Sequence, residues 1–334
     1  MTPPWIGLQT RQLLAQRGHA WLLHGPSGLG QYSLAMELAR AWLCEQPKQD
    51  RDGISGACGI CGSCHAIDVR THADMCVLMP EVTMLELGWP LSEKAQAEVD
   101  DKKRKASKEI RVDAMRDAVE FSQRTSARGR GKVVLVFPAE NMNAITANAL
   151  LKTLEEPPGD VKFVLASESA HQLLPTIRSR CLGHSMHWPD AQSSLDWMQS
   201  LGVDGRIAQL TLKACGGRPE DAMAFYRSGL DPNAWSALPK AMARGDAVVF
   251  KDWSPPQIID SLHKLCHDLM AVNAGADPRF FEPTDLGRPP SLGVLSGWSK
   301  SLASAMRTMD HPFNAGLMQE ALVGQAKTAL NSQH

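Results

Sequence analysis

The sequence predicts an α/β fold in which a parallel sheet is followed by helical domains, and three observations support this prediction. First, three short segments have the aliphatic composition of buried strands: Ala20–His24, Lys132–Phe137 and Val161–Ala166. Second, helical patterns alternate with these strands, which is typical of parallel sheets. Third, after residue 190 the clear apolar patterns have helical spacing, as in Ile258, Ile259, Leu262, Leu265, Cys266 and Leu269.

The bulk composition is that of an ordinary globular protein, with 43% hydrophobic and 21% charged residues among 334. The net charge is −1, so bulk charge argues against a dedicated DNA-binding protein. Residues 1–18 lack the apolar core of a signal peptide, and no apolar run approaches the length of a membrane span. We therefore expect a soluble cytoplasmic protein.

The first elements are a short helix, expected over Gln9–Gln16, and the strand Ala20–His24. A glycine-rich turn follows the strand. A second helix follows the turn, with one apolar face formed by Leu34, Leu38, Ala41 and Trp42. Strand, glycine-rich turn and helix in this order are the context that a P-loop needs.

The turn itself is a P-loop without its two chemical groups. Gly25, Gly28 and Gly30 are the candidate phosphate-binding glycines. Gln31, however, stands where a P-loop lysine would reach the β- and γ-phosphates, and Tyr32 stands where a Ser or Thr would hold Mg²⁺. Two alternatives remain: a backbone nest that binds a nucleotide weakly, or a tight turn without a ligand. We expect no bound ATP.

Four of the eight cysteines have the spacing of a metal site: Cys44, Cys58, Cys61 and Cys64. Four soft ligands separated by glycines favour a tetrahedral Zn²⁺ site, and a complete shell of cysteines makes that site structural. The alternatives are free thiols in a loop, or His65 replacing one cysteine. A nucleic-acid-binding zinc knuckle is disfavoured because the flanking residues carry no basic or aromatic cluster.

A strand is expected over Cys76–Met79, then an insertion from about 81 to 109, then a helix over Ile110–Arg124. The insertion carries a basic run at its centre, made of Lys102, Lys103, Arg104 and Lys105. Such runs are usually solvated, and acidic neighbours weaken the field that a DNA contact would need. A DNA contact through this run is the alternative interpretation.

The most distinctive stretch is Asn143–Cys181. Its first part predicts a helix that begins after Asn143 as N-cap and ends before Pro157-Pro158. One helix face is apolar, through Ala147, Leu150, Leu151 and Leu154. The strand Val161–Ala166 comes next, and a short helical piece then carries Arg178 and Arg180. Without their context, two such arginines indicate a solvent-exposed helix end.

In this order, NALLKTLEEPP, a strand and SRC resemble the clamp-loader group of AAA+ proteins. The more detailed resemblance is to the delta-prime family of bacterial DNA polymerase III clamp loaders. It covers nearly the whole chain and is strongest over 19–64 and 110–181. Members of this group also carry a small zinc module at the place of the four cysteines, and the segment 311–326 is similar to their last collar helix.

The resemblance implies three domains: a RecA-like AAA+ domain with a degenerate P-loop and a zinc module (1–188), a helical lid (189–229) and a helical collar for oligomerisation (230–334). It also implies the partners, which are the gamma/tau and delta clamp-loader subunits and, indirectly, the sliding clamp and primer-template DNA. The chain would then belong to the cytoplasmic replisome, as an accessory subunit of a DNA-directed DNA polymerase, a nucleotidyltransferase.

The resemblance further implies that this chain does not hydrolyse ATP. In active AAA+ proteins the strand at 132–137 ends in Asp-Glu, which holds Mg²⁺ and activates water, but here the pair is Phe137-Pro138. Glu140 lies too far along the chain to replace it. Ser167 falls near the position of a phosphate-sensing residue. Arg218 lies beside a second sensing position, but we do not assign it that role.

The same resemblance gives Arg180 a role, because the arginine of SRC reaches across a subunit boundary in this group. Arg180 would act in trans on the ATP site of a neighbouring gamma/tau subunit, where a guanidinium meets phosphate oxygens bidentately. Two functions of other classes remain as alternatives: a self-sufficient AAA+ ATPase with an unusual P-loop, and a zinc-dependent nucleic-acid-binding module.

Overall fold

The structure is a computed structural model that describes residues 2–51, 53–229, 231–251, 253–308 and 314–332. It divides into two compact units, Met1–Pro189 and Asp190–His334. The further division of the second unit at residue 229 into a lid and a collar stays a prediction. Residues 311–313 of the expected last-helix segment lie outside the described residues.

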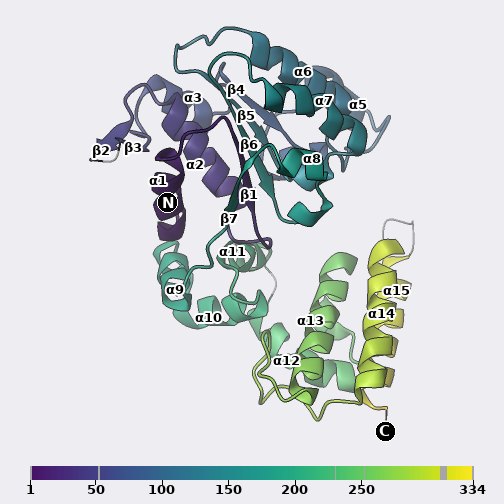
Figure 1. Cartoon of the computed structure of the whole chain (residues 1–334). Coiled ribbons are helices and arrows are strands. Elements are labelled where there is room, and N and C mark those ends of the chain that lie inside the picture. The colour runs from purple at the N-terminus through teal and green to yellow at the C-terminus, as the bar shows by residue number, and fades with distance from the viewer. Residues whose placement is uncertain (1, 52, 230, 252, 309–313, 333–334) are drawn as a thin grey trace. The chain divides into compact units, whose positions relative to one another are not determined.

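The first unit is built on a five-stranded parallel sheet (Figure 1), which confirms the predicted fold class. Its strand order is β4 (Met75–Leu78), β5 (Lys132–Val136), β6 (Val161–Ser167), β1 (Ala20–His24) and β7 (Leu182–Ser185). β7 has no strand pattern in the sequence, because Leu-Gly-His-Ser contains no β-branched residue. Backbone pairing with β1 forms this strand despite its composition.

The helices of the first unit are α1 (Pro4–Leu14), α2 (Gln31–Leu43), α3 (Gly62–Asp68), α4 (Glu81–Glu86), α5 (Glu93–Asp100), α6 (Val112–Gln123), α7 (Ala144–Glu155) and α8 (Pro175–Arg178), with short 3₁₀ turns η1 (Ala139–Asn141) and η2 (Ala170–Gln172). The hairpin β2 (Lys48–Asp50) and β3 (Gly53–Gly56) lies in the cysteine-rich segment. Figure 1 shows α6, α7 and α8 on one face of the sheet and α2 on the other.

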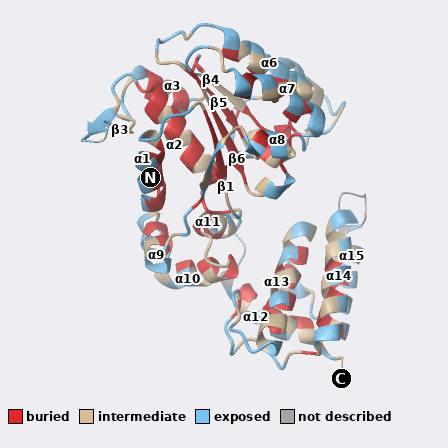
Figure 2. Ribbon diagram, viewed as in Figure 1, coloured by how far each residue is buried: buried red, intermediate tan, exposed pale blue. Residues whose placement is uncertain are grey.

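Alternate strand residues face these two helical layers, as a pleated strand requires. Leu22, Val134 and Leu165 pack into one buried cluster with Met115 of α6 and Leu150 of α7. Their neighbours in each strand point to the face that α2 covers, and Figure 2 shows the central strands buried on both faces. The continuous aliphatic composition of these strands therefore reflects burial from both sides.

Two expected helix bounds differ from the structure. The first helix runs over Pro4–Leu14 instead of Gln9–Gln16, because Pro4 suits the first helical position and Trp5 and Ile6 are buried against the fold. The helix expected over Ile110–Arg124 begins only at Val112. The expected bounds of the other segments agree within a residue or two, and Asn143 caps α7 by accepting from Thr146 N at 3.0 Å.

Parallel strands bring three positions of interest to one edge of the sheet. The glycine-rich turn leaves β1, Phe137 follows β5, and Ser167 ends β6. All three positions lie at the carboxyl ends of parallel strands. Ligand sites in open α/β sheets lie at the edge formed by these ends. The fold therefore places the parts of the candidate nucleotide site beside one another.

The second unit consists of helices, with no strand among its described residues. They are α9 (Ala191–Ser200), α10 (Gly205–Ala214), α11 (Pro219–Arg227), α12 (Pro232–Arg244), η3 (Val248–Phe250), α13 (Pro255–Asn273), α14 (Leu292–Thr308) and α15 (Ala315–Leu330). The predicted apolar stripe of α13 is buried along its whole length. It packs against an aromatic cluster that includes Trp235, Trp253, Phe250 and Phe281.

A buried carboxylate orders the loop before α14. Asp268 is fully buried, and its carboxylate accepts hydrogen bonds from the backbone N–H groups of Arg279, Phe280 and Phe281 at 3.0, 2.7 and 2.9 Å. Three backbone donors compensate for the cost of burying this charge.

No helix within the described residues has both the length and the apolar character to cross a bilayer.

Candidate functional site

The turn between β1 and α2 has the backbone of a P-loop. Gly28 and Gly30 adopt φ angles of 76° and 94°, in the left-handed region that favours glycine. Gly25 has a different reason to be glycine, because a Cβ there would lie 3.0 Å from the Cβ of Met186. All three predicted glycines thus have a local structural role in this turn, whether or not a ligand binds to it.

Gln31 fills the turn from within. Its side chain is 2% exposed, and its Nε2 donates to the carbonyl oxygens of Gly25 and Pro26 at 2.8 and 2.7 Å. A neutral amide therefore occupies the position from which a P-loop lysine would extend its charge to a phosphate. Its donors are used on the turn itself.

The two other altered positions meet each other. The rings of Tyr32 and Phe137 lie 5.4 Å apart between centroids, tilted by 33°, and Trp89 donates its Nε1–H to the Tyr32 hydroxyl at 2.8 Å. Burial raises the pKa of Tyr32 above its ordinary value. Aromatic rings therefore occupy the positions where an ATPase would place a metal-binding hydroxyl and a carboxylate. Tyr32 and Phe137, which lie far apart in the sequence, therefore pack together in one cluster.

Ser167 and Glu140 are used locally at the same edge. The Ser167 hydroxyl accepts from Ser169 N at 3.2 Å, and its carbonyl accepts from Gly25 N at 3.4 Å. Glu140 accepts from Glu168 N at 3.0 Å. The backbone of Ser167 therefore connects the end of β6 to the glycine-rich turn, and the side chain of Glu140 connects η1 to the residue after β6.

The four predicted cysteines come together in the first unit. The Sγ atoms of Cys44, Cys58, Cys61 and Cys64 all lie within 4.8 Å of one another, and three of the pairs are 3.7 to 3.9 Å apart. A tetrahedral ion with metal–sulfur bonds of about 2.3 Å has sulfur–sulfur edges of about 3.8 Å. The four thiols could therefore hold one metal ion, while His65 is exposed and outside this group.

Backbone N–H groups point at these sulfurs. Cys58 N donates to Cys44 Sγ at 3.3 Å, Cys61 N to Cys58 Sγ at 3.3 Å, and Cys64 N to Cys61 Sγ at 3.5 Å. Burial acts against ionisation of Cys61, but hydrogen bonds from backbone N–H groups lower the pKa of its thiol to about 6. Burial raises the pKa of Cys64 to about 12. A bound cation would favour the thiolate form of all four cysteines.

A closed ring of polar contacts connects the cysteine module to the sheet. Glu45 Oε1 accepts from Arg128 Nη1 at 2.6 Å and from Ser63 Oγ at 3.2 Å. His72 accepts from Asp74 N at its Nδ1, at 3.0 Å, so its Nε2 carries the proton toward Ser63 Oγ at 3.1 Å. Burial lowers the pKa of His72, which favours its neutral form. Two members of this ring, Glu45 and Ser63, directly adjoin cysteines of the four-cysteine cluster.

Asp74 closes the ring, and sequence reasoning did not identify it. It is fully buried and accepts from Ser126 Oγ, Ala127 N and Arg128 N at 3.0, 2.7 and 2.8 Å, with Lys132 Nζ at 3.4 Å. Burial acts against its ionisation, but these donors lower its pKa below the ordinary carboxyl range. A single Asp before a strand carries no sequence signal for such a role.

The basic run of the insertion is partly structural. Arg104 binds Glu81 through both terminal nitrogens, with Nη2 2.8 Å from Oε1, and its Nε lies 2.7 Å from Glu98 Oε2. Lys103 pairs with Asp101 at 2.8 Å. Lys102 and Lys105 are exposed. Arg104 holds the insertion together through these contacts. It is therefore not available for the alternative function of the run, a contact with DNA.

The two arginines of the SRC region differ in their surroundings. Arg180 follows α8 and donates from Nε to Glu155 Oε1 at 2.7 Å, from Nη2 to the same oxygen, and from Nη1 to Thr176 O at 2.8 Å. Arg178 is the last residue of α8, is exposed, and has no ion-pair partner within the described part of the chain. In the second unit, Arg218 is engaged by Cys215 O and Asp221.

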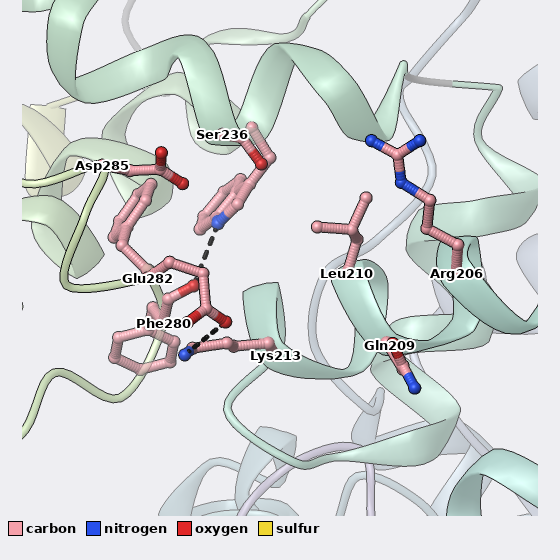
Figure 3. A pocket seen from close by; sticks show the side chains of 10 residues that line it. Arg206, Gln209, Leu210, Lys213, Ser236, Phe280, Glu282 and Asp285 are labelled. Atoms are coloured by element: carbon pink, nitrogen blue, oxygen red, sulfur yellow. Dashed lines mark hydrogen bonds and ion pairs between the residues drawn. The ribbon is translucent and has the colours of Figure 1, made fainter.

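A separate pocket of about 250 Å³ lies in the second unit, between α10, α12 and the loop before α14 (Figure 3). Lys213 Nζ and Glu282 Oε1 face each other across 2.6 Å, and Trp235 Nε1 donates to Phe280 O at 3.1 Å. These polar groups satisfy one another, and none of the residues predicted from the sequence to form a site lines this pocket.

Comparison with known proteins relates the chain to replication proteins. A family model described as DNA polymerase III, delta subunit, matches residues 7–188. The DNA polymerase III subunit delta' of Pseudomonas aeruginosa is 38% identical over 231 residues, which are 68% of this chain but only 62% of that protein. The subunit delta' of Escherichia coli is 32% identical over 258 residues, 75% of this chain and 67% of that protein.

Among solved structures, a DNA polymerase III gamma-subunit-related protein from Thermotoga maritima aligns with a TM-score of 0.50. The alignment covers 98% of this chain and 100% of that chain at 16% sequence identity. At this identity the likeness concerns the fold alone.

Replacing Asp74 is expected to destabilise the first unit strongly. In Asp74→Asn, Lys132 stays buried without its counter-charge, and breaking a buried ion pair costs about 3 kcal/mol or more. The Asp74 pKa is lowered on folding, so its contribution is fully present above the ordinary carboxyl pKa of about 4 and is lost as pH falls below it. Urea unfolding of both proteins between pH 7 and pH 3 measures the difference.

The matched control is Asp113→Asn, which removes an 81% exposed carboxylate from the surface pair with Arg116. Such pairs contribute about 0 to 1 kcal/mol. Equal stability of the Asp74 and Asp113 variants at pH 7, or a difference that grows toward pH 3, would contradict this account of Asp74.

Proposed function

Because this chain belongs to the DNA polymerase III delta-prime family, we propose that it is a non-catalytic subunit of a bacterial clamp loader. The complex would contain gamma/tau and delta subunits and load the sliding clamp onto primed DNA for the polymerase, as part of the cytoplasmic replisome. The chain itself would not hydrolyse ATP. It would support the ATP-driven cycle of its neighbours.

The observation that carries this proposal is the contrast between a filled nucleotide site and a fixed arginine. Gln31 satisfies the turn with its amide, and Tyr32 packs on Phe137, so charge, metal ligand and water-activating carboxylate are all absent from these positions. Arg180 nevertheless keeps a guanidinium held at the surface of the same unit. An arginine without a phosphate to serve in its own chain is suited to serve one in a neighbouring chain.

In this proposal Arg180 acts as an arginine finger on a gamma/tau ATP site. Charge builds up on the γ-phosphate oxygens in the transition state of phosphoryl transfer, and a guanidinium in trans stabilises it. Lysine is a poor substitute, because a point charge does not reproduce the planar fork.

We further propose that the ion held by the four cysteines is Zn²⁺ in a structural role. Support comes from four thiols at tetrahedral spacing and from the N–H groups that donate to the sulfurs. With four protein ligands no coordination position is left open for chemistry. The ion would therefore fix the module against α2 and α3.

Arg180→Ala is expected to leave this chain folded and able to assemble, because a half-exposed guanidinium contributes little to the core. DNA-stimulated ATPase of the complex reconstituted with gamma/tau and delta should fall. The loss at a fully dependent site is on the order of 10³ to 10⁵ in rate, diluted in bulk by the remaining sites. Arg180→Lys should restore little of the activity.

Arg178→Ala is the control for this experiment, since Arg178 is exposed and has no ion-pair partner among the described residues. Wild-type turnover by the Arg180→Ala complex together with loss of activity in Arg178→Ala would show that the other arginine acts in trans. If neither variant changes turnover, the trans-finger proposal is wrong.

The isolated chain is expected to show no ATP turnover above background. Gln31→Lys alone should not create activity, because the aromatic pair still fills the metal position and Phe137-Pro138 supplies no carboxylate. Steady-state phosphate release by the wild-type chain and the variant measures this. Sustained turnover by the wild-type chain, purified free of gamma/tau, would refute it.

Freshly purified chain is expected to carry about one Zn²⁺, and Cys61→Ser should lose it with local unfolding of the module, since metal binding supplies folding energy at such sites. Metal content should also fall as pH decreases, because protons compete for the thiolates. Elemental analysis measures both effects. Cys181→Ser is the control, as Cys181 lies outside the cluster; absence of zinc from fresh wild-type protein would sink the assignment.

A further inference from the structure

Glu155, at the end of α7, makes the closest contacts with the Arg180 guanidinium. Its Oε1 accepts from both Nε and Nη2, which is the side edge of the guanidinium plane. A carboxylate in the last turn of a helix opposes the helix dipole, so the helix itself gives no reason for an acid at this place. The contact with Arg180 supplies one.

The remaining contacts of Arg180 define what it can still bind. A guanidinium has five N–H groups, of which two point at Glu155 and one, on Nη1, points at Thr176 O at 2.8 Å. The two that remain lie one on each terminal nitrogen, with only a long 3.4 Å contact from Nη1 to Ser179 Oγ. A guanidinium that keeps one N–H group on each terminal nitrogen can still meet two phosphate oxygens at once.

We propose that Glu155 is the positioning residue for Arg180: it holds the side edge of the guanidinium so that the terminal fork stays available to a phosphate of the neighbouring subunit. This inference rests on the proposed trans role of Arg180. Because the side chain is already ordered, less freedom is lost when it engages its target, and reactions of this kind are sensitive to displacements of about 1 Å.

The neighbouring positions provide contrasts within the same chain. Glu156 follows Glu155 and is exposed, without an ion-pair partner among the described residues. Arg178 precedes Arg180 by two positions and also lacks such a partner. Of these four residues, only Glu155 and Arg180 form an ion pair with each other, and Arg180 is the arginine of the SRC sequence.

The test uses clamp-loader complexes reconstituted with gamma/tau and delta. The chain is supplied as wild type, Glu155→Ala, Glu155→Gln, Glu156→Gln, Arg180→Ala, or Glu155→Ala combined with Arg180→Ala. DNA-stimulated ATPase is measured over a range of ATP concentrations to separate kcat from KM. Thermal unfolding of each chain alone checks the fold, and Glu155→Gln carries the test if Glu155→Ala does not fold.

Glu155→Ala is expected to lower kcat at the dependent site roughly 10-fold or more, with KM for ATP nearly unchanged, because substrate binding does not involve this residue. Glu155→Gln should lose less, since its amide oxygen still accepts one hydrogen bond. Glu156→Gln should match wild type. The double variant should be no slower than Arg180→Ala, because a positioning residue has no effect without the group it positions.

The outcomes separate this inference from the proposed function. If Arg180→Ala slows turnover while Glu155→Ala and Glu155→Gln equal or exceed wild type, the finger stands and the positioning role of Glu155 is wrong. If the double variant is much slower than Arg180→Ala, Glu155 acts independently and the inference is also wrong. If Arg180→Ala itself turns over like wild type, the proposed function fails and this inference with it.

Discussion

The structure of the first unit depends on the backbone pairing of β1 between β6 and β7. This pairing puts the turn after β1 at the same edge as the ends of β5 and β6, so Tyr32 and Phe137 are neighbours although they lie far apart in the chain. It also fixes the connection from β6 to β7, on which Arg180 lies. The filled nucleotide turn and the placement of Arg180 are thus two products of one strand order.

Packing explains why the nucleotide turn is stable without a ligand. A P-loop that lost only its lysine would keep a polar cavity with an unpaired hydroxyl and carboxylate, and buried polar groups without partners are costly. Here the amide of Gln31 bonds two carbonyls, and two aromatic rings take the positions of the polar pair. Trp89 extends the cluster into the 81–109 insertion through its bond to Tyr32. The substitutions form a consistent set, and reverting one would disturb the others.

Sequence reasoning succeeded where a periodic pattern is long or a motif has fixed spacing. The strands at 20–24 and 132–136, helix α7 and the four cysteines all belong to this class. It failed where long-range contacts decide: β7 exists because β1 pairs with it, and α1 begins early because the rest of the fold covers Trp5. Asp74 and Glu155 could not be found, since each acts through partners 25 or more positions away in the chain.

The filled turn has a consequence for the thermodynamics of the proposed assembly. A ligand shifts a conformational equilibrium only by binding two states with different affinity. A domain that does not bind ATP, as proposed for this chain, would give ATP no such difference to act on. Its conformation would then be the same before and after hydrolysis elsewhere in the complex. In the proposed assembly such a subunit would be the fixed reference against which nucleotide-driven motion of the other subunits becomes useful work.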